Sequence, residues 1–116
     1  MPPTPSQHLA MLRGAEVAVV AVDGDSGAVV GYITAIGDGV LTASIPLLEV
    51  LPAWQGRGIG SELVRRVLTE LGPRYMVDIV CDDDIVSFYE RLGFSPYQAM
   101  IRRDRQALTG EPQAAR

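Results

Sequence analysis

The chain has 116 residues, of which 47% are hydrophobic, so its length and composition fit one domain with a core of its own. The formal net charge of −4, without a basic cluster, argues against nucleic acid as a substrate or partner. A single cysteine excludes an intrachain disulfide, and the single histidine, His8, has no companions that would make a metal site. No long apolar segment or leader sequence is visible, so we expect a cytoplasmic protein without a membrane partner.

Residues 1–13 are expected to form an N-terminal tail with a short helix. The three prolines among the first five residues favour an extended start. Residues 6–12 could then add one or two helical turns, with Ser6 as the cap and with Leu9 and Leu12 facing inward.

Three apolar segments rich in β-branched residues follow, at residues 17–22, 28–36 and 40–51. They are separated by two short stretches rich in Asp and Gly, residues 23–27 and 37–39, which are typical of hairpin turns. The pattern predicts an antiparallel meander of three strands.

A glycine-rich loop at residues 55–60, with the sequence QGRGIG, leads into an amphipathic helix that begins near Ser61 and ends at Gly72 and Pro73. Glycines let the backbone approach a ligand closely, and the first amides of a helix point outward with the positive end of its dipole. The loop is therefore predicted to bind a phosphate or pyrophosphate. The next apolar segment, residues 75–81, is expected to form a strand after a right-handed parallel crossover.

A dinucleotide-binding loop is the competing interpretation of these glycines. Gly56 and Gly58 fit the pattern G-x-G-x-x-G, and Asp78 lies at about the distance of a ribose-binding acid, but the third glycine position is Ser61. A nucleotide-dependent oxidoreductase is therefore a distant alternative, since a meander that feeds one crossover is not a doubly wound fold.

A second motif, FYERLGF at residues 88–94, lies on a short helix expected to start at Asp84. In the glycine loop, Gln55, Gly58 and Gly60 match the pattern Q/R-x-x-G-x-G/A. With the two motifs in this order and at this spacing, the chain resembles the GNAT superfamily of acyl-CoA-dependent N-acetyltransferases.

The resemblance covers roughly residues 16–103 and implies an α/β (α+β) fold with a mixed sheet. In this fold an antiparallel meander is followed by a β-α-β-α-β unit. We expect the domain to span residues 14–106, with a flexible C-terminal tail at 107–116. The family's first strand and first helix normally precede the meander, so the fold is expected to be shortened at its N-terminus.

The resemblance also implies a function. The chain is expected to transfer an acetyl group from acetyl-CoA to a primary amine by direct attack in a ternary complex. The alternative is an acyl-CoA-binding module without turnover. Because the missing N-terminal elements usually form one wall of the acceptor pocket, a second subunit could supply that wall, which favours a homodimer.

Tyr89 is the candidate general acid, because a phenol with an ordinary pKa near 10 stays protonated at neutral pH and can donate its proton to a thiolate. Packing is the alternative explanation: Gly93 in a left-handed conformation would place Phe94 against Tyr89. Glu49 is the candidate general base, although it could instead pair with an arginine. Asp78 is a weaker candidate, expected to be partly buried.

The family resemblance assigns the coenzyme to backbone groups, with the Val50 amide as donor to the acyl carbonyl. The strands around Val50 and Ile79 must then splay apart to admit the ligand. Asp82 stands where the family often has an asparagine that contacts the coenzyme, although helix capping also explains the acidic cluster around it. Arg57 would add charge near the phosphates. The residues predicted to bind acetyl-CoA are Leu48, Val50, Gln55, Gly56, Arg57, Gly58, Ile59, Gly60, Ser61, Asp82 and Phe88.

Overall fold

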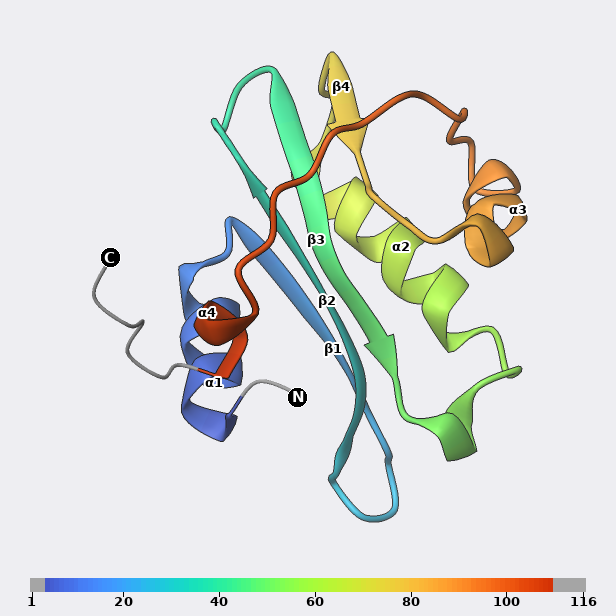
Figure 1. Cartoon of the computed structure of the whole chain (residues 1–116). Helices are drawn as coiled ribbons and strands as arrows, with labels where there is room; N and C mark the ends of the chain where they lie inside the picture. The colour runs from blue at the N-terminus through green and yellow to red at the C-terminus, as the bar shows by residue number, and fades with distance from the viewer. Residues whose placement is uncertain (1–3, 110–116) are drawn as a thin grey trace.

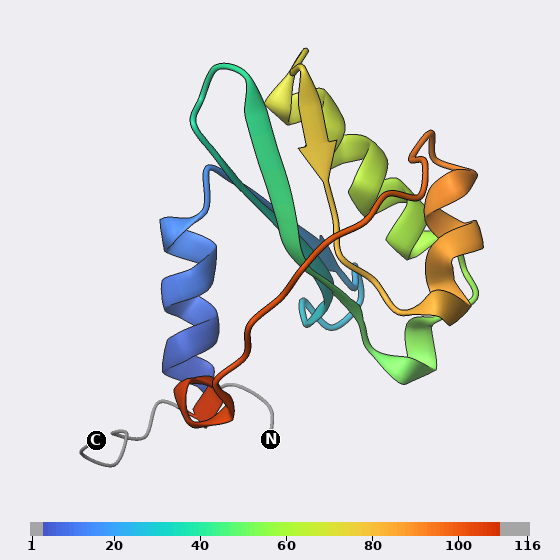
Figure 2. The same cartoon turned by 45° about the horizontal axis from the view of Figure 1, so that its top comes forward.

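The computed structural model of this protein describes residues 4–109, which form a four-stranded sheet with helices on both faces (Figure 1). The elements are α1 (Pro5–Gly14), β1 (Val17–Val22), β2 (Val29–Gly37), β3 (Thr42–Val50), η1 (Pro52–Trp54), α2 (Ile59–Leu71), β4 (Met76–Asp78), η2 (Asp83–Ile85), α3 (Val86–Glu90) and α4 (Arg105–Thr109). Helices α1 and α2 lie on opposite sides of the sheet (Figures 1 and 2).

The strands lie side by side in the order β1-β2-β3-β4. Each of the first three is antiparallel to its neighbour, whereas β4 is parallel to β3 and follows it through α2. One meander and one crossover confirm the predicted mixed sheet. They contradict the doubly wound fold that the dinucleotide alternative requires.

A bulge interrupts the pairing of β2 with β3. Thr34 pairs with Leu47 and Ile36 pairs with Ser44, so two residues of β3, Ile45 and Pro46, stand opposite a single residue of β2. Proline has no amide hydrogen for the ladder, and a bulge accommodates it.

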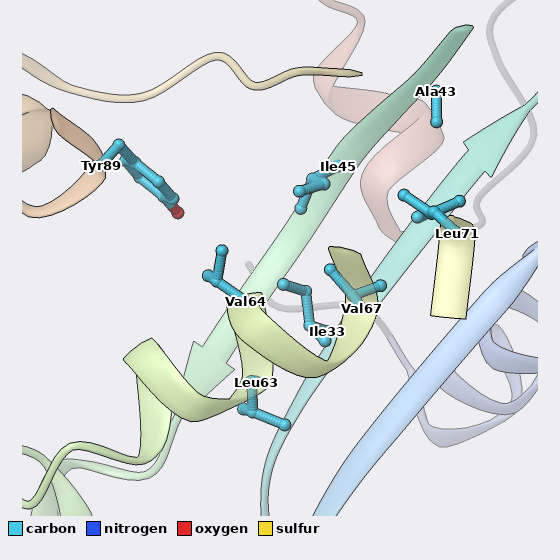
Figure 3. Packing of buried hydrophobic residues seen from close by; sticks show 9 residues of the cluster. Ile33, Ala43, Ile45, Leu63, Val64, Val67, Leu71 and Tyr89 are labelled. Atoms are coloured by element: carbon cyan, nitrogen blue, oxygen red, sulfur yellow. The ribbon is translucent and has the colours of Figure 1, made fainter. Parts of the chain in front are cut away.

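The core lies between α2 and one face of the sheet (Figure 3). Buried residues recur along α2 at spacings of one, three and four positions, which aligns them on one side of the helix. Burying a large apolar side chain contributes roughly 1.5–3 kcal/mol. The cluster consists of Ile33, Ala35, Ala43, Ile45, Leu63, Val64, Val67, Leu71 and Tyr89.

The opposite face of β2 presents Val30, Tyr32 and Thr34, which are also buried. Helix α1 lies over this face, and the His8 ring meets the Tyr32 ring edge-on at a centroid distance of 5.9 Å. The strand is therefore buried on both sides.

Helix α1 differs in detail from the expected short helix. Its cap is Thr4 and not Ser6: the Thr4 hydroxyl accepts from the Gln7 amide at 3.2 Å, and the Gln7 side chain accepts from the Thr4 amide at 2.9 Å. Pro5, expected in an extended tail, is the first helical residue, where a missing amide hydrogen costs nothing. Leu9 is 47% exposed, so its predicted inward position is wrong.

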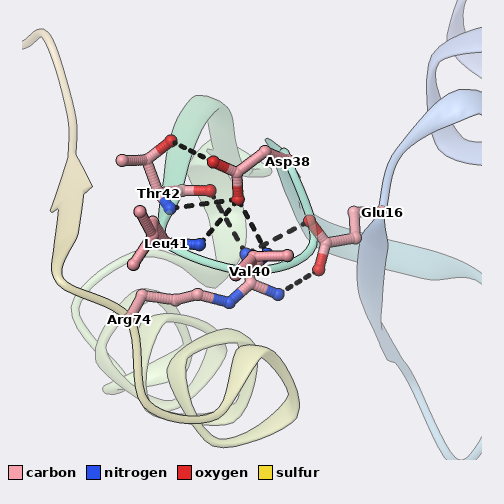
Figure 4. A network of polar contacts seen from close by, with 6 residues as sticks. All are labelled: Glu16, Asp38, Val40, Leu41, Thr42 and Arg74. Carbon is pink, nitrogen blue, oxygen red and sulfur yellow. Dashed lines mark hydrogen bonds and ion pairs between the residues drawn. The ribbon is translucent and has the colours of Figure 1, made fainter.

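A polar network holds the end of the sheet where β3 and β4 pair (Figure 4). Arg74 forms an ion pair with Glu16 and donates to the Thr42 carbonyl at 3.2 Å. In the β2–β3 turn, a carboxylate oxygen of Asp38 accepts from the amides of residues 40–42 at 2.7, 2.8 and 3.2 Å. These contacts join β1, the β2–β3 turn and the segment before β4.

The C-terminal third departs from the expected strands. β4 is shorter than residues 75–81, because its pairing with β3 ends at Ser44 and Asp78. The final strand of the expected β-α-β-α-β unit is not formed, since residues 95–104 run without helix or strand and have no strand neighbour in the described chain. Helix α4 then includes the first residues of the predicted tail at 107–116, and the rest of that tail lies outside the described residues.

Candidate functional site

The open edge of β3 is the first feature of the site. The Leu51 amide donates to the Val30 carbonyl at 2.8 Å, toward β2. Because amides alternate in direction along an antiparallel strand, the amides of Leu48 and Val50 point to the other edge. Since β4 stops pairing at Asp78, these amides face no strand within residues 4–109. This arrangement agrees with the splay expected near Val50.

The glycine loop lies next to this edge. Gly56 and Gly58 have φ angles of 78° and 84°, a region that favours glycine, and Gly58 is the N-cap of α2. The helix begins at Ile59, two residues before the predicted start, and its first turn closes with the bond from the Glu62 amide to the Gly58 carbonyl at 3.1 Å. The amides of residues 59–61 therefore have no partner within the helix and can bind an anion.

Gln55 connects the loop to β3. Its side-chain amide donates to the Val50 carbonyl at 3.0 Å, which fixes the end of the open edge relative to the first turn of α2. Arg57 folds back over the Trp54 ring at 4.7 Å and reaches the Ala53 carbonyl at 3.4 Å. The sequence indicated Gln55 and Arg57 as coenzyme ligands, but it gave no signal for these internal contacts.

Gly60 allows α3 to approach α2. A Cβ atom at Gly60 would lie 3.5 Å from the Phe88 ring, so the ring packs directly over the first turn of α2. By contrast, a Cβ atom at Gly56 or Gly58 would meet no described atom within 4 Å. The last glycine of the loop therefore serves helix packing, whereas the first two serve the turn and leave space beside it.

Tyr89 belongs to the core as well as to the candidate site. It is 6% exposed, and its ring lies edge-on to those of Phe88 and Phe94 at 4.9 and 5.7 Å. Gly93 has a φ of 94°, and the Phe94 amide donates to the Tyr89 carbonyl at 3.1 Å. The predicted helix-ending contact is confirmed, so packing alone accounts for this part of the motif.

The Tyr89 side chain points into the molecule, with its hydroxyl toward Ile45 of β3 and Val64 of α2 (Figure 3). Burial raises the pKa of Tyr89, and the nearby Cys81 raises it further. The phenol therefore stays protonated at neutral pH, as a general acid must.

Glu49 lies on the other face of β3. Leu48 and Val50 pack against the core, whereas Glu49 is exposed and pairs across the sheet with Tyr32. The β3 backbone thus separates Glu49 from Tyr89. Glu49 forms no ion pair with an arginine in the described part of the chain, so this alternative is wrong.

Two expectations about acidic residues are corrected. Asp78 is exposed, not partly buried, because the inward positions around it belong to Val77 and Ile79. The Asp82 side chain makes no capping hydrogen bond; the turn that it precedes is closed by the Ile85 amide donating to the Asp82 carbonyl at 3.1 Å. Capping therefore does not explain Asp82.

Comparison with known proteins agrees with this architecture. The profile of the family described as acetyltransferase (GNAT) domain matches residues 14–96. A crystal structure of a proposed acetyltransferase from Deinococcus radiodurans R1 is 53% identical, with a TM-score of 0.90 over 97% of this chain and 78% of that chain. A GNAT-family protein from Streptococcus pneumoniae TIGR4 is 33% identical, with a TM-score of 0.74 over 88% and 81% of the two chains. The chain belongs to the GNAT acetyltransferase domain family.

Among curated proteins, GCN5-related N-acetyltransferase 3 of Arabidopsis thaliana, named as chloroplastic, is 41% identical over 60% of this chain. N-alpha-acetyltransferase 30 of Schizosaccharomyces pombe is 31% identical over 75% of this chain. The chain spans 30% and 63% of the lengths of these two relatives. In residues 4–109, no helix has both the length and the apolar character needed to cross a membrane.

Proposed function

We propose that this chain transfers an acetyl group from acetyl-CoA to a primary amine by direct attack in a ternary complex. The observation that carries the proposal is the unpaired edge of β3 beside the unpaired first turn of α2. Gln55 ties the Val50 carbonyl to the glycine loop, and Phe88 ties the start of α2 to the helix that holds Tyr89. These contacts connect three parts of the proposed site: the open edge of β3, the first turn of α2 and the Tyr89 phenol.

The donor side fits coenzyme A. The free amides of residues 59–61 would bind the pyrophosphate, and the open space beside Gly58 leaves room for it. The pantetheine arm would lie along the edge at Leu48 and Val50 as an added strand. The Val50 amide would then donate to the acyl carbonyl and stabilise the oxyanion that forms there.

The reaction needs two proton transfers. The amine nitrogen attacks the thioester carbonyl carbon and forms a C–N bond, and Glu49 accepts the proton that the nitrogen loses, directly or through water. The tetrahedral intermediate then collapses with cleavage of the C–S bond. The departing thiolate takes a proton from Tyr89, which gives the amide product and free coenzyme A.

A binding module without turnover is the second candidate. The packing of Tyr89 between Phe88 and Phe94 accounts for its position without any chemistry. The two candidates share the donor site and differ only in turnover.

The test is calorimetric titration of the purified protein with acetyl-CoA, with NADH titrated alongside. We expect micromolar binding of acetyl-CoA alone, followed by acetylated product when a panel of primary amines is incubated with the complex and analysed by mass spectrometry. Binding without product from any amine supports the binding module. Absence of acetyl-CoA binding contradicts both candidates.

We also propose a homodimer in which the second copy completes the acceptor side. Tyr97 and Met100 lie where the chain forms neither helix nor strand and are 99% and 95% exposed, which is unusual for such large apolar side chains. Light scattering should show a dimer for the wild type and a monomer after Tyr97→Ser with Met100→Ser. Val40→Ser, at another exposed apolar site, is the matched control. A wild-type monomer at high concentration contradicts the dimer.

A further inference from the structure

The Tyr32 hydroxyl is a buried polar group that the fold does not explain. Tyr32 is 9% exposed, and its hydroxyl makes no hydrogen bond of normal length and direction within residues 4–109. Buried hydroxyls in folded proteins nearly always have a partner, because leaving one unpaired is costly. The hydrogen-bond partner of this hydroxyl is therefore expected to be a neighbouring side chain that can move, or a ligand.

Glu49 is the polar group that faces Tyr32 from β3. It stands directly opposite Tyr32 in the β2–β3 ladder, and directly opposite residues share one face of the sheet with Cβ atoms about 4.5–5.5 Å apart. Burial raises the pKa of Tyr32 to about 12, and the Glu49 carboxylate adds to the rise through its negative charge and a hydrogen-bonding contact with the hydroxyl. The phenol is thus a neutral donor beside a carboxylate that can only accept.

The surroundings leave Tyr32 little freedom, whereas Glu49 is exposed on an otherwise apolar stretch of β3. From α1, the His8 ring packs edge-on against the Tyr32 ring, and the His8 Nδ1 atom lies 3.2 Å from the Thr4 carbonyl. Glu49 and His8 are the titratable groups that face Tyr32 from β3 and α1. A buried phenol donor beside an exposed carboxylate is the arrangement expected of a positioning residue.

We propose that Tyr32 is a positioning residue for Glu49. Its hydroxyl donates to the carboxylate and holds it on the α1 side of β3, where the acceptor amine approaches. A free glutamate side chain samples many rotamers, and restricting it to one geometry favours proton transfer. This inference rests on the proposed function, in which Glu49 accepts the amine proton.

The test compares Tyr32→Phe with Thr34→Val. Both substitutions delete one hydroxyl from the same buried face of β2, but Thr34 stands opposite Leu47 and not Glu49. Tyr32→Phe should lower kcat about tenfold and leave the acetyl-CoA affinity unchanged. A tenfold loss is smaller than the loss expected from removing the general base itself. Thr34→Val should change neither quantity.

Two further measurements separate this inference from the proposed function. In a Glu49→Gln background, Tyr32→Phe should have no additional effect on kcat, because its action passes through Glu49. The carbon NMR signal of the Glu49 carboxyl group should shift in Tyr32→Phe and not in Thr34→Val, whether or not turnover occurs.

The outcomes are distinct. A shifted Glu49 signal in a protein without turnover supports the contact and contradicts the proposed enzyme. An active wild type whose kcat and Glu49 signal are the same in Tyr32→Phe overturns the positioning role and leaves the enzyme intact.

Discussion

The two ends of the β3–β4 pair differ in how their polar groups are paired. At the closed end, Arg74 pairs with Glu16 and donates to the Thr42 carbonyl, and Asp38 accepts from backbone amides of the β2–β3 turn (Figure 4). At the open end, beyond Ser44 and Asp78, one edge of β3 has no strand beside it in the described chain. The difference indicates how a small domain can keep backbone groups available for a ligand: one end is fixed so that the other can stay apart.

The largest effect is expected from Tyr89→Phe at the open end. If Tyr89 is the general acid, its loss should lower kcat about 100-fold, which is typical of one proton-transfer group. Acetyl-CoA affinity should stay nearly constant, since the aromatic packing is kept. Steady-state kinetics and calorimetry measure the two effects separately.

Tyr75→Phe is the matched control for this experiment, because it deletes the hydroxyl of an exposed tyrosine that is 85% accessible. It should leave both quantities unchanged. An unaltered rate in Tyr89→Phe would remove Tyr89 as the acid and leave packing as its role.

The next effect is expected from Gly58→Val, which tests whether the open end binds the donor. A side chain here would fill the space beside the loop and weaken acetyl-CoA binding about tenfold or more, or roughly 1.4 kcal/mol. Gly39→Val is the control, since Gly39 has a similar φ of 80° and equally open surroundings in the described chain but lies in the β2–β3 turn.

Both valine variants should lose stability by similar amounts, about 1–2 kcal/mol, because valine is strained at positive φ. Calorimetry should show weaker binding only for Gly58→Val. Equal affinities in the two variants would contradict the anion site at the start of α2.

The smallest effect is expected from Asp38→Ala at the closed end, and it depends on pH. Hydrogen bonds from three backbone amides lower the pKa of Asp38 from 3.8 to about 2. A lowered folded-state pKa gives stability that is fully present above about pH 4 and is lost as pH falls toward 2. The Tm difference between wild type and Asp38→Ala should therefore be constant near neutral pH and shrink in acid.

Acetyl-CoA affinity should be unchanged in Asp38→Ala at neutral pH, because the closed end does not contact the loop. A Tm difference that persists unchanged to pH 2 would show that the carboxylate charge is not what stabilises the turn.

Local patterns in the sequence were enough to predict several parts of the site. The three strands of the meander, the helix after the glycine loop and the left-handed Gly93 each depend on neighbours a few residues away. Their backbone dihedral preferences and the spacing of their apolar residues depend only on short stretches of sequence. Alternation of side chains along a strand also accounts for the placement of Glu49 and Val50 on opposite faces of β3.

Tertiary structure alone decided the remaining features. Two features depend on register between segments that are distant in sequence: the point where β4 leaves β3, and the position of Tyr32 opposite Glu49. Such pairings are selected by the burial of the whole sheet against α1 and α2, and no local preference encodes them. The sequence by itself determined the elements and the chemistry they carry, while long-range packing determined which groups stay paired and which remain open.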